Sequence, residues 1–170
     1  MIEIRDEAPQ DFPAIRNLNV LAFGNPAEAL LVDKLRAANK AAISRVAILD
    51  GRVVGHILFS PITVERAPAR FRGLGLAPMS VLPEFQNRGI GSSLVRDSLE
   101  MCRQKGYDLV VVLGHLRFYP RFGFTTAKDH GLNNEYDAVD NFMVIELKEE
   151  VLKAVTGLVK YAPEFQDLGI

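Results

Sequence analysis

The sequence contains no tryptophan and only one cysteine among its 170 residues. The lone cysteine, Cys102, cannot form an intrachain disulfide, which favours a reducing compartment. An excess of charge of one sign is also absent, because 20 Lys and Arg face 21 Asp and Glu for a formal net charge of −1. A near-neutral chain has no global attraction for nucleic acid or for an anionic membrane surface.

Long hydrophobic runs are missing as well. No apolar stretch approaches the roughly 20 residues of a membrane-spanning helix, and residues Met1–Arg16 lack the apolar core of a secretory leader. We therefore expect a cytoplasmic protein with neither a nucleic-acid nor a membrane partner. A chain of this length fits one domain, which we expect to span residues 1–170 with a C-terminal extension from about residue 148 to 170.

Hydrophobic periodicity predicts a mixed α/β (α+β) fold, in which helices flank a mostly antiparallel central sheet. Asp50-Gly51 between two apolar runs is a strong hairpin signal, and Pro78 makes the strand that contains it irregular. The expected strands are 2–5, 44–49, 53–64, 73–82, 109–113 and 142–147. The expected helices are 12–22, 27–38, 89–105 and a short one near 116–121. Leu30, Leu31 and Leu35 are expected on the apolar side of the second helix.

The most informative stretch is a strand that runs into a glycine-containing loop, which in turn opens a helix. Its sequence is Val81-Leu82-Pro83-Glu84-Phe85-Gln86-Asn87-Arg88-Gly89-Ile90-Gly91-Ser92. The first turn of a helix leaves backbone N–H groups unpaired, and its dipole favours negative charge. Gly89 and Gly91 lack Cβ atoms, so a bulky anion can approach the backbone. The pattern predicts a pyrophosphate cradle; the alternative is simply a glycine-tolerant helix start.

The glycine pattern does not fit the commoner nucleotide motifs. A dinucleotide fingerprint needs a third glycine where Leu94 stands, and a phosphate loop of the Walker type needs Gly-Lys-Ser/Thr. Gln86-Asn87-Arg88-Gly89-Ile90-Gly91 instead resembles the Q/R-x-x-G-x-G/A motif of the GNAT superfamily of N-acetyltransferases. Phe118-Tyr119-Pro120-Arg121-Phe122-Gly123-Phe124 resembles that family's F-Y-x-x-x-G-F signature. These motifs, together with Val54-Gly55-His56-Ile57 and the C-terminal aromatic pattern, make the chain most similar to the bacterial YhbS-like branch.

The resemblance implies a GNAT fold with splayed central strands and acetyl-CoA as cosubstrate. The pantetheine arm would pair with a strand edge, here Met79, Ser80 and Val81, with the Val81 N–H as oxyanion donor. The pyrophosphate would lie on the loop from Gln86 to Ser92. The implied residues for binding acetyl-CoA are Met79, Ser80, Val81, Gln86, Asn87, Arg88, Gly89, Ile90, Gly91 and Ser92.

Tyr119 falls on the family's tyrosine, which would protonate the departing thiolate; the alternative is a buried ring with its hydroxyl bonded to the backbone. The general base stays open between Glu28 and His56, and each has a structural alternative, a solvated helix residue and a satisfied core histidine. An asparagine that many relatives place before the tyrosine is replaced here, and Gly114 or His115 could substitute for it. His115, His130 and Cys102 show no ligand spacing, so no metal is expected.

The expected reaction is direct transfer of an acetyl group from acetyl-CoA to a primary amine of a small molecule or peptide. The alternative is a non-catalytic acyl-CoA-binding sensor or scaffold. An acidic stretch could attract a cationic amine or could be a solvated loop; its members are Asp129, Glu135, Asp137 and Asp140. A homodimer is expected from apolar residues of the tail that could pack across subunits, namely Leu152, Val155, Leu158, Val159, Tyr161 and Phe165.

Overall fold

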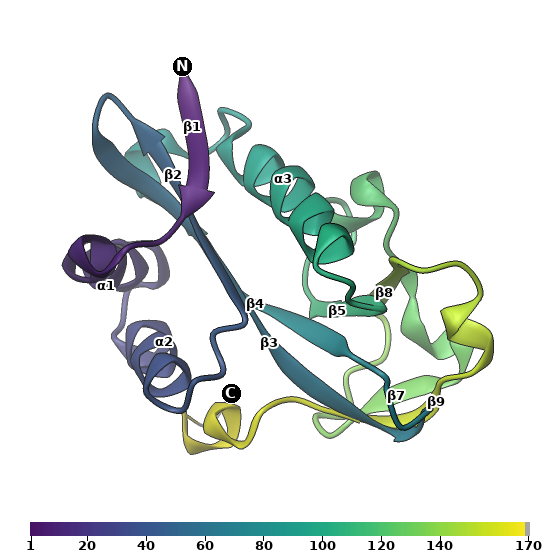
Figure 1. Ribbon diagram of the computed structural model, residues 1–170. Helices are drawn as coiled ribbons and strands as arrows, with labels where there is room; N and C mark the ends of the chain where they lie inside the picture. The colour runs from purple at the N-terminus through teal and green to yellow at the C-terminus, as the bar shows by residue number, and fades with distance from the viewer. Residues whose placement is uncertain (169–170) are drawn as a thin grey trace. The chain divides into compact units, whose positions relative to one another are not determined.

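The computed structural model describes residues 1–168 (Figure 1). It contains three α-helices, α1 (Phe12–Phe23), α2 (Ala27–Ala37) and α3 (Ile90–Gln104). The strands of the described chain are β1 (Ile2–Asp6), β2 (Ile43–Leu49), β3 (Arg52–Arg66), β4 (Gly73–Val81), β5 (Leu109–Leu113), β6 (Thr125–Thr126), β7 (Leu132–Asn134), β8 (Phe142–Glu146) and β9 (Thr156–Lys160). This is the expected mixed, mostly antiparallel architecture.

The chain forms two compact units, each assembled from separate stretches of sequence. Among the described residues, the first unit comprises 1–60, 77–100 and 163–168, and the second comprises 61–76 and 101–162. The long strands β3 and β4 and the helix α3 each contribute residues to both units.

In the first unit, β1 pairs with β2 and β2 with β3, both antiparallel. The β2–β3 hairpin turns at Asp50 and Gly51, with φ of 50° and 76°, the backbone that the Asp-Gly pair predicted. Gly55 faces α3, since a Cβ added there would lie 2.9 Å from Leu94 Cδ1. The neighbouring His56 faces the opposite side, because successive strand residues alternate. The helices α1 and α2 cover that opposite side (Figure 1).

Helices α1 and α2 form where the sequence predicted them. Pro9 opens the preceding 3-10 turn, and Gly24 ends α1 in a left-handed conformation with φ of 75°. The expected apolar side of α2 is wrong at Leu30, which is 49% exposed, whereas Val32 is buried. The buried face of the helix lies around Leu31, Val32 and Leu35, and it is turned about the helix axis relative to the face that we predicted.

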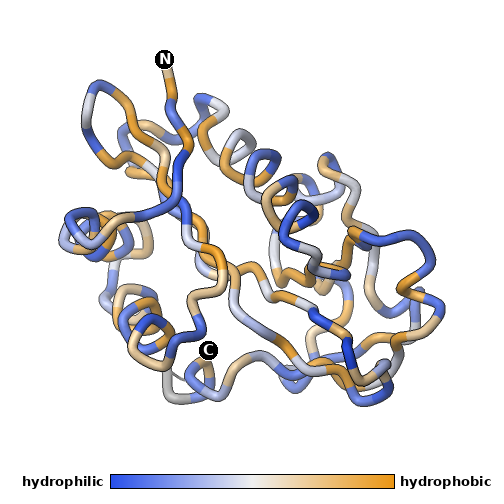
Figure 2. The backbone as a smooth tube through the Cα atoms, viewed as in Figure 1, coloured by the Kyte–Doolittle hydropathy of each residue, from blue (hydrophilic) through white to orange (hydrophobic). Residues whose placement is uncertain are grey.

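In the second unit, β4 pairs in parallel with β5, and β5 pairs antiparallel with β8. The β4–β5 register covers Gly73–Gly75 against Leu109–Val111, and this short ladder agrees with the splay expected of the central strands. Strand β5 is an apolar segment in Figure 2 and is buried over Leu109–Val112. The predicted helix near 116–121 is instead a 3-10 turn at Tyr119–Phe122.

The C-terminal segment packs within the chain rather than offering an apolar surface. Strand β9 pairs antiparallel with β3 and parallel with β7, and Val155, Val159 and Tyr161 are buried in this unit. Phe165 is likewise buried in the first unit. The apolar residues on which we based a homodimer are therefore mostly core residues of the monomer, and the dimer itself stays a prediction.

Candidate functional site

The predicted cradle is a tightly turned loop between β4 and α3. After Val81, a 3-10 turn at Pro83–Phe85 leads into Gln86, whose Nε2 donates to the Val81 carbonyl at 2.9 Å. Asn87 and Gly89 then adopt left-handed conformations, with φ of 64° and 83°. Glycine suits this conformation at Gly89 because it has no Cβ. The loop is thus tied to the end of β4 and turned sharply into the helix.

The start of α3 presents backbone donors. The Gly89 carbonyl accepts the Ser93 N–H at 3.1 Å, so the N–H groups of Ile90, Gly91 and Ser92 precede the first carbonyl available within the helix. A Cβ placed on Gly89 would meet no atom within 4 Å. Open space above a helix N-terminus, with its positive dipole end, fits a phosphate group.

Two other residues predicted for this site, Ser80 and Arg88, have side chains that contact neighbouring residues of the chain. The Ser80 hydroxyl donates to Asn19 Oδ1 of α1 at 2.7 Å, and both side chains are buried. Ser80 can therefore contribute only its backbone to a strand-edge site. The Arg88 guanidinium lies 5.3 Å from the centre of the Phe85 ring, which holds its charge near the loop.

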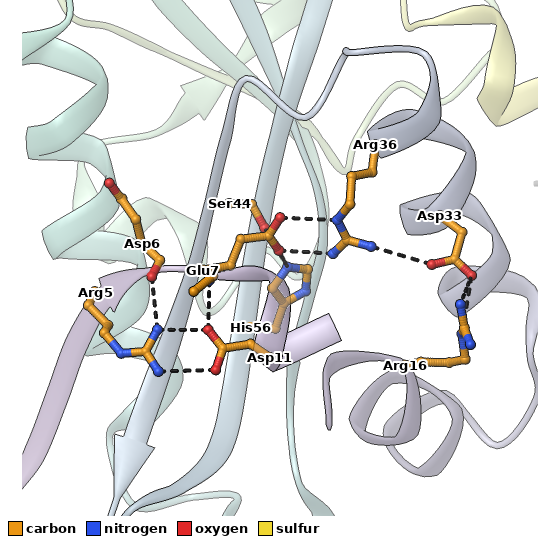
Figure 3. A network of polar contacts seen from close by, with 10 residues as sticks. Arg5, Asp6, Glu7, Asp11, Arg16, Asp33, Arg36, Ser44 and His56 are labelled. Carbon is orange, nitrogen blue, oxygen red and sulfur yellow. Dashed lines mark hydrogen bonds and ion pairs between the residues drawn. The ribbon is translucent and has the colours of Figure 1, made fainter. Parts of the chain in front are cut away.

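A polar network lies on the α1 and α2 side of the first unit's sheet (Figure 3). His56 on β3 is fully buried, and its Nε2 lies 2.8 Å from the Ser44 hydroxyl of β2. Ser44 in turn donates to Glu7 Oε1 at 2.6 Å. Arg36 of α2 donates to both oxygens of Glu7, at 2.9 and 3.1 Å. One chain of contacts therefore joins the imidazole to a carboxylate and a guanidinium.

The surroundings set the charge of each member. Burial lowers the pKa of His56, Glu7 opposes this and Arg36 adds to it, and the resulting pKa is about 4. For Glu7, burial raises the pKa, but hydrogen bonds from Arg36 and Ser44 outweigh it, and the pKa lies below its usual range. At neutral pH the network therefore holds a neutral imidazole and an ionised carboxylate.

Neither candidate base, Glu28 nor His56, fully fits its purely structural interpretation, a solvated helix residue for Glu28 and a satisfied core histidine for His56. Glu28 is not fully solvated, because its Oε1 is buried and has no hydrogen-bond partner in the described chain. His56 is not fully satisfied, because its Nδ1 is buried and likewise lacks a partner there. Buried polar atoms are rarely left in this state, so both remain candidates for contact with a substrate.

Tyr119 belongs to the second unit and is 6% exposed. Its ring packs edge-on against Phe118 and Phe124, with centroids 4.9 and 5.5 Å away. A Cβ on Gly114 would lie 2.3 Å from the ring, so glycine is needed there to admit the tyrosine. Burial raises the pKa of Tyr119 to about 12, and the phenol therefore keeps its proton at neutral pH.

Gly114 and His115, suggested as substitutes for the asparagine of many relatives, both make backbone hydrogen bonds within the chain. The Gly114 N–H donates to the Asn141 carbonyl at 3.0 Å, so this N–H is engaged within the chain. The His115 carbonyl accepts from the N–H groups of Phe118 and Tyr119 at 3.1 and 3.3 Å. In the acidic stretch, Glu135 Oε1 accepts the Tyr161 N–H at 3.0 Å, and at least this carboxylate is structural.

Sequence reasoning missed Glu7, Arg36, Ser44 and Asn19. A signal was present for Asn19, because it lies four residues after Ile15 on the apolar side of α1 and is fully buried. Glu7, Arg36 and Ser44 come from three different elements, and only the folded chain brings them together. No group of His, Cys, Asp or Glu side chains suited to a metal occurs among residues 1–168. No helix in that range is long and apolar enough to span a membrane.

Comparison with known proteins gives consistent results. Residues 3–127 match the family model described as an acetyltransferase (GNAT) domain. The uncharacterised N-acetyltransferase YhbS of Escherichia coli K12 is 36% identical over 164 residues, which cover 95% of this chain and 97% of YhbS. The L-amino acid N-acetyltransferase AaaT of the same organism is 30% identical over 167 residues, covering 86% of this chain and 98% of AaaT.

Solved structures agree with the sequence matches. The crystal structure of E. coli YhbS in complex with CoA has a TM-score of 0.91 and covers 97% of this chain and 92% of YhbS, at 35% identity. The structure of a GNAT-family acetyltransferase from Brucella melitensis in complex with acetyl-CoA has a TM-score of 0.81, covering 97% and 98%, at 36% identity.

Proposed function

Since the chain belongs to the GNAT family of N-acetyltransferases, we propose that it transfers an acetyl group from acetyl-CoA directly to a primary amine of a small molecule or peptide. The observation that carries the proposal is the loop between β4 and α3. It combines two left-handed residues, open space at Gly89 and a helix N-terminus with available N–H donors. The CoA and acetyl-CoA complexes of its relatives support the same cosubstrate for this chain.

The proposed roles follow from the surroundings of each residue. The backbone from Asn87 to Ser92 binds the pyrophosphate of acetyl-CoA, while Arg88 adds a positive charge. The edge of β4 at Met79–Val81 holds the pantetheine arm, and the Val81 N–H stabilises negative charge on the carbonyl oxygen. Gln86 acts indirectly, because its amide fastens the loop to Val81. Acetyl-CoA supplies an activated thioester, and the protein supplies placement.

Tyr119 is the proposed general acid. Its raised pKa keeps the proton on the phenol until negative charge develops on the leaving sulfur. A residue that acts only as charge develops changes kcat more than ground-state affinity. Tyr119→Phe is therefore expected to lower kcat by about 10²–10⁴-fold while acetyl-CoA affinity stays near that of the wild type.

The control is Phe118→Leu, which alters the same aromatic cluster without removing a hydroxyl. Melting temperatures of both variants report any loss of folded protein. If Tyr119→Phe turns over at the wild-type rate per folded molecule, the assignment is wrong.

The acceptor is proposed at the level of a primary amine. The relative AaaT is named as an L-amino acid N-acetyltransferase, and the match covers 86% of this chain. L-amino acids are therefore the first compounds to test in a panel of primary amines. Turnover is measured as CoA release that depends on the added amine. Binding of acetyl-CoA without transfer to any amine in the panel would favour the sensor or scaffold role instead.

A further inference from the structure

His56 presents a buried nitrogen that nothing in the described chain engages. The side chain has no exposed surface, and its Nδ1 has no hydrogen-bond partner among residues 1–168. Burying a polar atom without a hydrogen-bond partner is unfavourable, because the atom loses its contact with water. The hydrogen-bonding character of this nitrogen indicates what kind of group it could contact.

The protonation of the imidazole follows from its neighbours. Glu7 is ionised, so its Oε1 can only accept, and the Ser44 hydroxyl must spend its single proton on Glu7. The Ser44 oxygen then accepts from His56, and Nε2 therefore carries the proton. In a neutral imidazole the other nitrogen has a free lone pair. Nδ1 can therefore accept a hydrogen bond from an N–H or O–H donor.

The position of His56 along the sheet gives this lone pair its significance. Strands β3 and β4 are joined by residues 67–72 only, too short for a parallel crossover, so they are antiparallel. The Leu82 N–H donates to the Val54 carbonyl at 2.9 Å, so these two residues lie opposite each other. In an antiparallel pair, Ser80, two residues before Leu82, then lies opposite His56, two residues after Val54. Directly opposed residues point to the same face of a sheet. His56 is therefore next to the β4 segment proposed to hold the thioester.

We propose that His56 is the general base of the transfer reaction, with Nδ1 accepting a hydrogen bond from the acceptor amine, and that Ser44, Glu7 and Arg36 are positioning residues that fix its tautomer. This inference rests on the proposed function, because it assigns a role in the same reaction. It selects His56 over Glu28, for which residues 1–168 provide no comparable chain of supporting contacts.

The chemical step balances within the groups named. The neutral amine nitrogen forms a bond to the acetyl carbon, and the carbon–sulfur bond breaks. As the new N–C bond forms, one N–H proton becomes acidic and moves to Nδ1. The thiolate sulfur takes a proton from Tyr119. When the products leave, the imidazolium gives its proton to water and the tyrosinate takes one from water, so both groups return to their starting states.

The low pKa of His56 leaves its lone pair free but makes the imidazole a weaker base than an exposed histidine, so it can take a proton only from an amine that bond formation has made acidic. This pKa keeps Nδ1 unprotonated throughout the neutral range, so the lone pair is always available. The charged groups that act on the ring are Glu7, from the segment after β1, and Arg36 of α2. The carboxylate stabilises the transient imidazolium through Ser44, and Arg36 keeps that carboxylate ionised.

The first test does not depend on turnover. In protein labelled with ¹⁵N-histidine, His56 is assigned by comparison with His56→Gln, and its two nitrogen shifts are followed between pH 5.5 and 8. We expect the neutral tautomer with the proton on Nε2, and a shift of Nδ1 when ethylamine is added to the complex with CoA. A proton on Nδ1, or no response of Nδ1 to the amine, overturns the proposal.

The second test compares variants for catalysis. His56→Gln keeps a donor that can reach Ser44 but cannot take up a proton, and should lower kcat about 10²–10⁴-fold with acetyl-CoA affinity unchanged. Ser44→Ala should lower kcat less, and Ser44→Thr, which retains the hydroxyl, should restore it. Arg16→Ala is the control, because its ion pair with Asp33 lies on the same two helices and is exposed.

The outcomes separate the two proposals. If no amine is turned over by the wild type but the tautomer and the Nδ1 response are as expected, the proposed function fails and the binding role of His56 stands. If the wild type transfers acetyl groups and His56→Gln does so equally well, the base assignment fails alone. If His56→Gln does not fold, the Ser44→Ala and Ser44→Thr pair decides, and equal rates for the two variants overturn the proposal.

Discussion

The two faces of the first unit's sheet are built on different principles, although adjacent residues of one strand supply both. Gly55 faces α3, where an added Cβ would lie 2.9 to 3.3 Å from Leu94, Ile90 and Ala47. His56 faces the other way, among Ser44, Glu7 and Arg36 (Figure 3). Close packing dominates the first face, although Arg45 is buried there beside Asp97 of α3 at 2.8 Å. A network of hydrogen bonds with some atoms left unpartnered characterises the second face.

The comparison indicates where stability and function reside. An apolar face gains from every buried contact, whereas a buried polar layer contributes little net stability and is costly when incomplete. On the side of α1 and α2, Asn19, Glu28, His56 and Ser60 each have a buried side-chain atom that lacks a partner in the described chain, and on the α3 side Arg45 and Ser98 do as well. We therefore expect perturbation of the α3 face to alter folding, and perturbation of the polar face to alter pH dependence and catalysis.

Acid should weaken the polar face by the largest amount. The pKa of His56 is 6.5 in its ordinary state and about 4 when buried, so the unfolded chain binds the proton first. Stability is therefore full above pH 6.5 and is lost as the pH falls toward 4, by about 3 kcal/mol in total. Glu7, whose pKa is also lowered, adds a loss in the same direction at the acid end.

This prediction is checked by urea unfolding at a series of pH values. His56→Gln has no titrating group at this position, so its free energy of unfolding should fall less steeply between pH 6.5 and 4.5. Parallel curves for the variant and the wild type would show that His56 is not buried as a neutral ring.

On the opposite face, Gly55→Val should act through packing alone. The added atoms would overlap Leu94 and Ile90, and overpacking of this kind costs about 1–3 kcal/mol. The loss should not vary with pH. Val53→Ile, a methyl addition on the same strand at a partly exposed position, serves as the control and should change the melting temperature little.

The smallest effect is expected where polar contacts are exposed. Arg16 and Asp33 form an ion pair at 2.7 Å, with the arginine side chain 61% exposed. Such pairs contribute about 0–1 kcal/mol, so Arg16→Ala should shift the melting temperature only slightly. A loss as large as that of Gly55→Val would mean that the surface of the two helices supports the polar layer beneath it.

The sequence predicts local elements better than contacts between distant segments, for a physical reason. Periodicity located α1, α2, α3 and β5 within a few residues, and Asp50-Gly51 fixed the β2–β3 hairpin, because these signals are local. Strand β7, of three residues, pairs with the distant β9, and nothing within either segment indicates that partner. The same limit applies to the network of His56, whose members lie far apart in the chain.

The candidate site divides along the same line. The loop from Gln86 to Ser92 could be predicted because glycine spacing and a helix start are adjacent in sequence. The bond from Gln86 to Val81, and the use of Ser80 by Asn19, depend on side-chain directions that only the fold determines. The apolar tail was likewise assigned to a subunit interface because burial within the same chain cannot be distinguished from burial against a partner by composition.

The most direct measurement is a calorimetric titration of acetyl-CoA into wild type, Gly89→Val and Gly24→Val. Gly24 and Gly89 share a left-handed backbone, with φ of 75° and 83°, and an added Cβ meets nothing within 4 Å at either position. The two substitutions therefore impose similar backbone strain, but only one lies in the cradle. We predict wild-type affinity for Gly24→Val and a loss of at least about tenfold, equivalent to about 1.4 kcal/mol, for Gly89→Val, with similar melting temperatures for both. Equal affinity of the two variants would contradict the assignment of the β4–α3 loop as the acetyl-CoA site.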